Sequence, residues 1–346
     1  MKEKFKELIS DFQENPLPSF KKREINIPLN SGKIISIIGP RRSGKSHLMY
    51  QLISKLDKKK VVYINFEDER FNITTKDLDS ILKAYYELYP ENKEIYFFFD
   101  EIQEVQNWEK FVRRIYDTVS KNIFLTGSSA KLLSKEIATS LRGRTITFEV
   151  FPLSFKEFLK FKEVEINIYS SRGSSRLINN FRDYMHCGGF PEVINFNNLI
   201  WNKTIQQYFN VMLYKDIIER YKVANTTVLK LFLKKLFSNV SKEFSINKIY
   251  NEFKSHNYKI GKEYLYDFLD YSEDSYMLFV LEEYSNKLNL RSFKKIYSVD
   301  IALSKINSYA FDKDLGRLLE NIVFIELKRR NKEIYYHRDK HECDFV

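Results

Sequence analysis

The chain has 346 residues, enough for two or three domains, and 43% of them are hydrophobic, which suits soluble domains with real cores. The sequence has no run of about 18 apolar residues, no apolar export signal near its start, and only two cysteines, Cys187 and Cys343. We therefore expect a protein of the reducing cytoplasm without a membrane span or a disulfide framework. The net charge of +11 favours anionic partners such as nucleic acid, but ordinary basic proteins carry such a charge too.

The N-terminal part of the chain contains the pattern of a phosphate-binding loop. Residues 1–30 predict a helix and an extended, proline-containing lead, and the apolar residues 34–38 predict a buried strand. After this strand the sequence reads Gly39-Pro40-Arg41-Arg42-Ser43-Gly44-Lys45-Ser46, and a helical run follows over 47–53. This context favours a phosphate site over a chance glycine-rich turn, because the N–H groups of the loop and of the helix N-terminus would point at the anion.

Two side chains at the end of this loop have expected roles with a nucleoside triphosphate. Lys45 would reach the β- and γ-phosphates, and the hydroxyl of Ser46 would bind Mg²⁺. The two glycines, Gly39 and Gly44, would let the backbone wrap close to the phosphates. The sequence therefore predicts a nucleotide-binding protein that takes ATP together with Mg²⁺.

A strand further along the chain ends in two adjacent carboxylates. After a strand over 60–66 and a helix over 76–88, the apolar run 94–99 predicts a strand buried on both faces, followed by Asp100 and Glu101. Asp100 would hold Mg²⁺, mostly through water, and Glu101 would orient and deprotonate the attacking water. Apolar runs that end in two acids are common, and the phosphate loop upstream favours the catalytic interpretation.

Two more candidate groups lie near the fourth and fifth predicted strands. The fourth strand, predicted over 122–129, ends in small polar residues, and a hydroxyl at this end, such as that of Ser128, would bond the γ-phosphate or the lytic water, or would cap the next helix. Arg142 and Arg144 precede the fifth strand. One of them, with Arg144 favoured, is expected to act as an arginine finger on the γ-phosphate, and a solvated basic turn is the alternative.

Five predicted strands, the last over 145–150, alternate with helices along the first part of the chain. This alternation predicts an open, mostly parallel α/β sheet, with the ligand bound at the carboxyl ends of the strands. Since the phosphate loop follows the first of these strands, the sequence predicts a P-loop fold for this domain.

The ordered set of motifs resembles the archaeal and bacterial AAA+-type ATPases of the additional-strand class, which carry a C-terminal domain of unassigned function. The likeness rests on the loop over 39–46, the strand end at 100–101, and the runs 125–129, 141–144, 151–158, 188–192 and 214–220. The last three are signatures without known chemistry. The resemblance covers nearly the whole chain and implies the sheet order of RecA and AAA+ proteins. It also implies the roles given above: Lys45 and Ser46 for nucleotide and Mg²⁺, Asp100 for Mg²⁺, Glu101 as base and Arg144 as candidate finger.

The second half predicts a small helical module with a basic stretch. Three short helices over 228–237, 245–256 and 262–271, with a β-ribbon made by 277–284 and 294–300, form a winged-helix arrangement, which the resemblance also implies. The stretch from Lys230 to Lys262 contains eight lysines and two glutamates, which gives it a net charge of +6. A third helix in a DNA groove, with lysines on phosphates, would explain this charge. The alternatives are a merely solvated face and a module that binds protein.

The tail predicts an amphipathic helix that carries Glu320 and a short strand that carries Asp344. This pair resembles the start of a restriction-endonuclease-like fold. Such sites need a further strand with an acidic residue and a lysine, and the chain stops first, so we expect no cleavage of nucleic acid and suspect a truncated gene product. A metal site at His337, His341 and Cys343 is less expected than ordinary surface side chains, because the spacing is irregular.

The expected domains are a lead segment (1–30), a P-loop ATPase domain (31–155), a helical lid or linker (156–225), a winged helix (226–300) and a partial nuclease-like tail (301–346). We predict an Mg²⁺-dependent ATPase whose nucleotide state controls a module that contacts DNA. The alternatives are a nucleotide-dependent switch whose C-terminal half binds protein, and an ATP-gated nuclease with an incomplete site. AAA+ relatives often complete each site with a neighbour's arginine, so a homo-oligomer or a protein partner is also expected, with Arg144 acting in its own subunit or the next.

Overall fold

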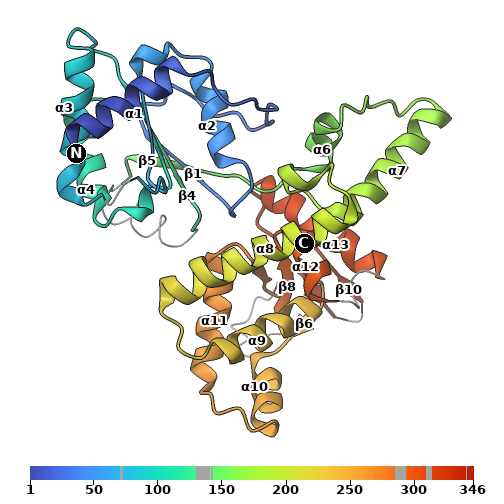
Figure 1. The fold of residues 1–346 in the computed structure, drawn as a ribbon. Coiled ribbons are helices and arrows are strands. Elements are labelled where there is room, and N and C mark those ends of the chain that lie inside the picture. Colours follow the sequence, from blue (N-terminus) through green and yellow to red (C-terminus); the bar gives the residue numbers. More distant parts are fainter. Residues whose placement is uncertain (71–72, 130–140, 142, 285–293, 309–313, 340) are drawn as a thin grey trace. The chain divides into compact units, whose positions relative to one another are not determined.

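The computed structural model describes residues 1–70, 73–129, 141, 143–284, 294–308, 314–339 and 341–346. The chain forms two compact units (Figure 1). The first contains Met1–Gly39 and Gly44–Val150, and the second contains Pro40–Ser43 and Phe151–Val346. By its contacts, the middle of the phosphate loop therefore belongs to the second unit. Within the described ranges, no helix is both long and apolar enough to cross a membrane.

The first unit is built on a five-stranded parallel sheet. Its strands are β1 Ile34–Ile38, β2 Val61–Asn65, β3 Tyr96–Asp100, β4 Ile123–Gly127 and β5 Thr145–Glu149, in the order β2-β3-β4-β1-β5. Every pairing in this sheet is parallel, which confirms the predicted α/β fold. Because β4 lies between β1 and β3, the loop after β1 and the acids at the end of β3 flank the carboxyl end of β4.

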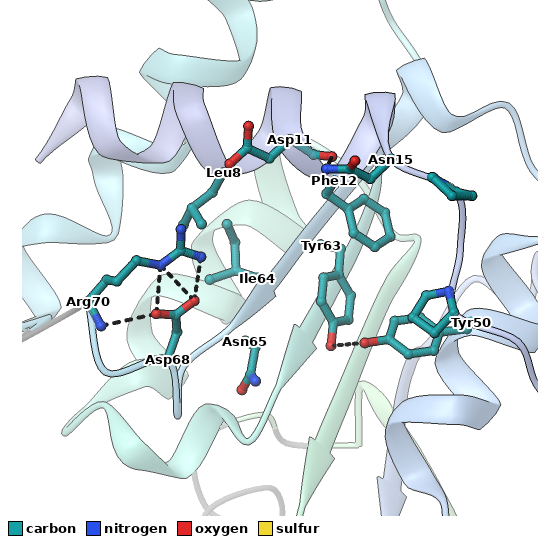
Figure 2. Close-up of a pocket in the computed structure, with 12 residues that line it drawn as sticks. Leu8, Asp11, Phe12, Asn15, Tyr50, Tyr63, Ile64, Asn65, Asp68 and Arg70 are labelled. Carbon is teal, nitrogen blue, oxygen red and sulfur yellow. Dashed lines mark hydrogen bonds and ion pairs between the residues drawn. The ribbon is translucent and has the colours of Figure 1, made fainter.

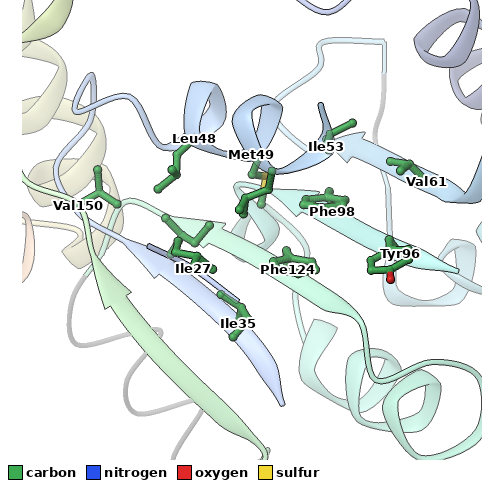
Figure 3. Packing of buried hydrophobic residues seen from close by; sticks show 12 residues of the cluster. Ile27, Ile35, Leu48, Met49, Ile53, Val61, Tyr96, Phe98, Phe124 and Val150 are labelled. Atoms are coloured by element: carbon green, nitrogen blue, oxygen red, sulfur yellow. The ribbon is translucent and has the colours of Figure 1, made fainter. Parts of the chain in front are cut away.

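Helices bury this sheet, and short 3₁₀ turns connect some of its elements. The helices are α1 Lys2–Glu14, α2 Lys45–Ile53, α3 Asp79–Leu88 and α4 Trp108–Thr118, and the turns are Lys58–Lys60, Thr75–Asp77 and Ile102–Glu104. β1, β3 and β4 are buried along their whole length, as their continuous apolar sequences predict. In the core shown in Figure 3, Met49 of α2 packs over the sheet near Phe98 and Phe124, whose rings stack 4.5 Å apart.

The second unit begins with helices. They are α6 Phe155–Phe161, α7 Ser171–Cys187, the 3₁₀ turn Pro191–Val193, α8 Asn198–Val211 and the π-helical segment Met212–Glu219. The turn after α7 requires its two glycines. A Cβ on Gly188 would lie 2.0 Å from Oδ1 of Asp300, and a Cβ on Gly189 would lie 2.5 Å from the backbone oxygen of Leu153. The signature over 188–192 therefore has a packing explanation.

Three helices and a small antiparallel sheet follow. The elements are α9 Thr226–Ser238, β6 Glu243–Phe244, α10 Ile246–Ser255, α11 Lys262–Asp274, β7 Leu278–Leu281 and β8 Lys294–Ser298, with the strands in the order β6-β8-β7. The three helices and the ribbon predicted for this part of the chain are present. The sequence missed β6, because a strand of two residues is too short to show an alternating pattern.

The last elements pack a lysine against the acidic side chains of the tail. They are α12 Ile301–Asn307, α13 Leu315–Arg329, β9 His337–Arg338 and β10 Glu342–Cys343. Nζ of Lys295, which is 2% exposed, lies 3.2 Å from Glu320, 2.6 Å from Glu342 and 2.7 Å from Asp344. In the part of the chain that the structure describes, no group of three or more histidines, cysteines or acids is placed to hold a metal ion.

Candidate nucleotide site

Glycines shape the backbone of the loop after β1. Gly39 has a φ of 149°, and a Cβ there would lie 2.2 Å from the backbone oxygen of Val150, so only glycine fits. Gly44, with a φ of 94°, precedes α2, whose first residue is Lys45. The first N–H groups of α2, which an α-helix leaves without a partner inside the helix, and its positive dipole end are therefore next to the loop, as an anion site requires.

The predicted loop lysine is buried and contacts the predicted catalytic base. Lys45 is 5% exposed, and its Nζ donates a hydrogen bond of 3.1 Å to the backbone oxygen of Gly39. The same Nζ lies 3.4 Å from Oε1 of Glu101. A buried ammonium in these surroundings binds anionic oxygen atoms strongly. The fold therefore brings together two residues that are far apart in the sequence and that were predicted to share one site.

Asp100 lies at the same edge of the sheet and accepts hydrogen bonds from three hydroxyl groups. It is 2% exposed, and its donors are Tyr63, at 2.8 Å, Thr126 and Ser46. The pKa of Asp100 is raised, chiefly by burial and then by the charge of Glu101, although these hydrogen bonds oppose the rise. Asp100 and Ser46, predicted separately as Mg²⁺ ligands, are thus in direct contact.

Glu101 is held in a conformation that few residues other than glycine adopt. Its φ is 52°, and its backbone N–H donates to Oγ1 of Thr126 at 2.8 Å. Nε2 of Gln103 donates to Oε2 of Glu101 at 2.5 Å. Backbone strain of this kind persists where the surroundings enforce it, which is common at functional sites. Thr126 therefore connects both acids, since its hydroxyl also donates to Asp100.

Ser128 follows β4 at this edge and is 1% exposed. Its Oγ has no hydrogen-bond partner among the residues that the structure describes. A helix that Ser128 would cap falls in 130–140, outside the described residues. The roles predicted for this hydroxyl therefore stay predictions.

Arg144 lies at the opposite edge of the sheet. Its backbone oxygen accepts from the N–H of Ile34, the first residue of β1, and its guanidinium pairs with Asp117 at 3.1 Å. The five-residue length of β1, at about 3.3 Å per residue, separates the two edges by about 16 Å. Arg144 is thus too far to reach phosphates held by its own loop, and its role as a finger in a neighbouring subunit stays a prediction. Arg142 lies outside the described residues.

The middle of the loop turns tightly. The N–H of Ser43 donates to the backbone oxygen of Pro40 at 3.3 Å, and Arg42 has a φ of 64°. The loop therefore reverses direction between its two glycines, which is what a backbone cradle for phosphate needs.

The two arginines of this turn contact acids that lie further along the chain and belong, like the turn, to the second unit. Nε of Arg41 donates to both carboxylate oxygens of Asp216, at 3.1 and 2.9 Å. Nη1 of Arg42 lies 3.5 Å from Oε2 of Glu192, and its guanidinium lies 5.5 Å from the ring centroid of Tyr208. Glu192 and Asp216 belong to two of the three signatures that had no known chemistry, and both side chains contact arginines of the loop.

A pocket of 360 Å³ lies under α1, lined by residues of α1, of β2 and of the segment after β2, and by Tyr50 of α2 (Figure 2). Its aromatic wall contains Phe12, Tyr50 and Tyr63, and the rings of Phe12 and Tyr63 stack 4.7 Å apart. Because the hydroxyl of Tyr63 donates to Asp100, this ring separates the pocket from the predicted metal ligand. Neither Tyr63 nor Thr126 was predicted from the sequence, although a hydroxyl inside an apolar strand is the signal that marks both.

These features define the class of the protein. Residues 31–159 match the family described as "AAA domain", so the chain contains an AAA+-type P-loop domain of the nucleotide-binding kind. Residues 178–308 match a "Domain of unknown function (DUF8612)". The likeness to AAA+-type ATPases predicted from the motifs is thereby confirmed for the first unit.

Two relatives match almost the whole chain and identify its family. The "Uncharacterized protein MJ1544" of Methanocaldococcus jannaschii is 42% identical over 333 residues, which cover 94% of this chain and 74% of that protein. An "Uncharacterized protein" of Haemophilus influenzae is 33% identical over 324 residues, which cover 91% of this chain and 78% of that protein. The chain belongs to the family of these proteins.

Among solved structures, the Aeropyrum pernix ORC1 protein in complex with DNA is similar over 96% of this chain and 93% of that chain. The identity is 8% and the TM-score is 0.35.

Proposed function

We propose that this protein binds ATP with Mg²⁺ and hydrolyses the bond between the β- and γ-phosphates, which gives ADP and inorganic phosphate. The observation that carries the proposal is the meeting of Lys45, Ser46, Asp100 and Glu101 at the carboxyl edge of one parallel sheet. These residues provide the parts that phosphoryl transfer requires: a cation for the phosphates, ligands for Mg²⁺ and a base for water. The match of residues 31–159 to the AAA domain family supports the proposal.

The oxygen atoms of the site suit Mg²⁺. The hydroxyl of Ser46 bonds the carboxylate of Asp100, and such hard oxygens bind Mg²⁺ together with water and phosphate. A divalent cation would also favour the ionised form of Asp100, which burial disfavours. When bound, the ion would neutralise charge on the β- and γ-phosphates.

Glu101 is placed to act as the general base. Lys45 lies against one of its carboxylate oxygens, and Gln103 donates to the other. A phosphate that attracts the ammonium of Lys45 would leave the first oxygen able to accept a proton from water. Because Thr126 fixes both acids, Asp100 and Glu101 keep separate tasks, with Asp100 on the metal and Glu101 on the water.

The test is ATP turnover by the whole chain with Mg²⁺ or with EDTA, in parallel with ATP affinity measured by calorimetry. We expect Glu101→Gln to bind ATP and to lower turnover by about 10²- to 10⁴-fold, because an amide accepts no proton from water. Glu104→Gln, at an exposed glutamate three residues along the chain, is the matched control and should turn over normally. Wild-type turnover by Glu101→Gln would show that the base has been wrongly assigned.

We further propose that the elements from α9 to β8 form a winged helix and that α11 contacts a protein. The order helix, strand, two helices and two strands is that of a winged helix. The face that α11 exposes carries the carboxylates of Glu263, Asp267 and Asp270, with Tyr264 and Tyr266 that are 54% and 49% exposed. Phosphates repel such a face, whereas exposed tyrosines are common anchors in protein interfaces.

The DNA contact was predicted from the excess of lysines over acids. It would then be made by three exposed lysines, of which Lys248 and Lys254 lie on α10 and Lys259 lies in the turn after it. Titration with duplex DNA at about 50 mM salt separates the two partners, because lysine–phosphate attraction is strongest at low salt. If DNA binds, replacing these lysines with glutamine should lower the log–log salt slope by about 0.9 for each lysine that neutralises a phosphate. Absence of binding would support the protein partner.

A further inference from the structure

Within the second unit, Arg41 is held by one buried carboxylate. Nε of Arg41 donates to both oxygens of Asp216, whose side chain is 1% exposed, while that of Arg41 is 14% exposed. A buried pair of this geometry is specific, and breaking it leaves an uncompensated buried charge. The position of Arg41 within the phosphate loop is therefore tied to Asp216, which lies 175 residues further along the chain.

A second arginine shares the same carboxylate. Nη2 of Arg220 lies 3.2 Å from Oδ1 of Asp216, one helical turn away. Nη1 of Arg220 is buried and has no hydrogen-bond partner among the described residues. Two guanidinium groups thus share one carboxylate, and the oxygens of an incoming phosphate group can compete with that carboxylate for them.

The backbone around Asp216 is also unusual. Met212–Glu219, which contains Asp216, is a π-helical segment, and π-helical turns are rare and often occur at functional sites. The chain then continues to Tyr221, whose ring stacks on Tyr271 of α11 at 3.8 Å. The hydroxyl of Tyr221 donates to Asp274, also on α11. The segment that holds the loop arginine is therefore directly connected to the proposed interaction helix.

We propose that Asp216 restrains the phosphate loop: its carboxylate holds Arg41, and the phosphates of a bound nucleotide compete for that guanidinium. The inference rests on the proposed function, because it requires a nucleotide at the loop. Asp216 acts through Arg41 and is a positioning residue. Since linkage is reciprocal, a nucleotide that attracts Arg41 also loosens the hold of the loop on the segment 212–219.

The neighbouring arginine offers a matched control. Arg42 pairs with Glu192 at 3.5 Å, but the two side chains are 63% and 50% exposed. Exposed pairs of this kind contribute little, because water and salt screen them. Replacing Glu192 therefore removes an acid that pairs with the same loop without removing a buried ion pair.

The experiment is calorimetric titration of the whole chain with ADP and with a non-hydrolysable ATP analogue, each with Mg²⁺. We expect Asp216→Asn to bind the analogue roughly tenfold more tightly, within the usual range of coupling between sites, and ADP by a smaller factor. In an Arg41→Ala background, Asp216→Asn should have no such effect. Glu192→Gln should change either affinity by less than about twofold, since its pair is exposed.

Hydrogen exchange of the wild-type chain provides a second readout that needs no variant. Peptides that cover 212–219 should exchange faster when the nucleotide is bound, because the loop releases Asp216. Unchanged exchange, or an effect of Asp216→Asn that persists without Arg41, would overturn the restraint while leaving ATP hydrolysis standing. A wild-type chain that binds neither nucleotide would overturn both proposals.

Discussion

Among the residues that the structure describes, each unit buries one lysine among polar groups, and the two lysines differ in what surrounds them. In the second unit, Lys295 meets three carboxylates at 2.6 to 3.2 Å, one for each of its N–H donors. Burial alone would lower the pKa of Lys295, but hydrogen bonds to Asp344 and Glu342 outweigh it, and the pKa is raised. In the first unit, Lys45 lies 3.4 Å from the carboxylate of Glu101 and 3.1 Å from a carbonyl of its own loop.

This difference separates a structural ion cluster from a ligand site. The ammonium of Lys295 has its donors satisfied by the tail and ties it to β8, so binding an anion there would break existing pairs. Lys45 instead lies within a glycine loop at the N-terminus of α2, where further N–H groups point at an incoming anion. The surroundings of a buried lysine therefore matter more for function than its nearness to acids.

The largest effect on ATP turnover is expected for Arg144, which lies near neither buried lysine. If Arg144 acts in a neighbouring subunit, Arg144→Ala should lower ATP turnover by about 10³-fold or more, the size of a finger effect. Mixing Arg144→Ala with Lys45→Ala should then restore activity, because a mixed assembly contains sites with an intact loop and an intact finger. Wild-type turnover by Arg144→Ala alone would show that Arg144 is not the arginine finger of the site around Lys45.

Near each buried lysine, one carboxylate accepts a hydrogen bond from a tyrosine. Replacing the two tyrosines therefore gives a matched pair of variants, for which we expect smaller effects. Tyr63 donates to Asp100 at 2.8 Å, and Tyr297 donates to Glu320 at 2.7 Å. Tyr63→Phe should weaken Mg²⁺ binding by about tenfold, as removal of a ligand's hydrogen-bond partner does. Tyr297→Phe should leave Mg²⁺ binding unchanged and reduce the free energy of unfolding by about 1 kcal/mol. Titration with Mg²⁺ in the presence of ADP measures the Mg²⁺ affinity of each variant, and thermal unfolding measures its stability. Equal Mg²⁺ affinities of the two variants would contradict the assignment of the metal site to Asp100.

Residues that are close in the sequence were predictable, and residues that meet across the fold were not. The loop from Gly39 to Ser46 is one continuous segment, and Asp100 and Glu101 follow a recognisable buried strand. Thr126 was missed because its contact with the acids depends on how β3 and β4 pair. Strand pairing is not visible in a sequence pattern that reports only which faces are buried.

Two other differences have equally physical causes. Arg144 precedes its strand, whereas the site residues follow theirs, so in a parallel sheet it lies at the opposite edge. The lysines that suggested a groove-binding third helix end at Lys262, where α11 begins, and the exposed face of α11 is acidic. Asp216 lies in a signature without known chemistry, and its contact could not be predicted because its partner Arg41 comes from the other half of the chain.

The most direct test of the nucleotide site compares the two buried lysines in one assay. Lys45→Met and Lys295→Met each replace a buried ammonium with an apolar chain of similar length, and Mg²⁺-ATP turnover is measured well below the unfolding temperature of both. We predict a drop of about 10²-fold or more for Lys45→Met, because a buried charge partner of the phosphates is gone. For Lys295→Met we predict turnover within about twofold of wild type, since the change removes only the structural ion cluster with Glu320, Glu342 and Asp344. Wild-type turnover by Lys45→Met, or an equal drop in Lys295→Met, would contradict the assignment of the nucleotide site to the first unit.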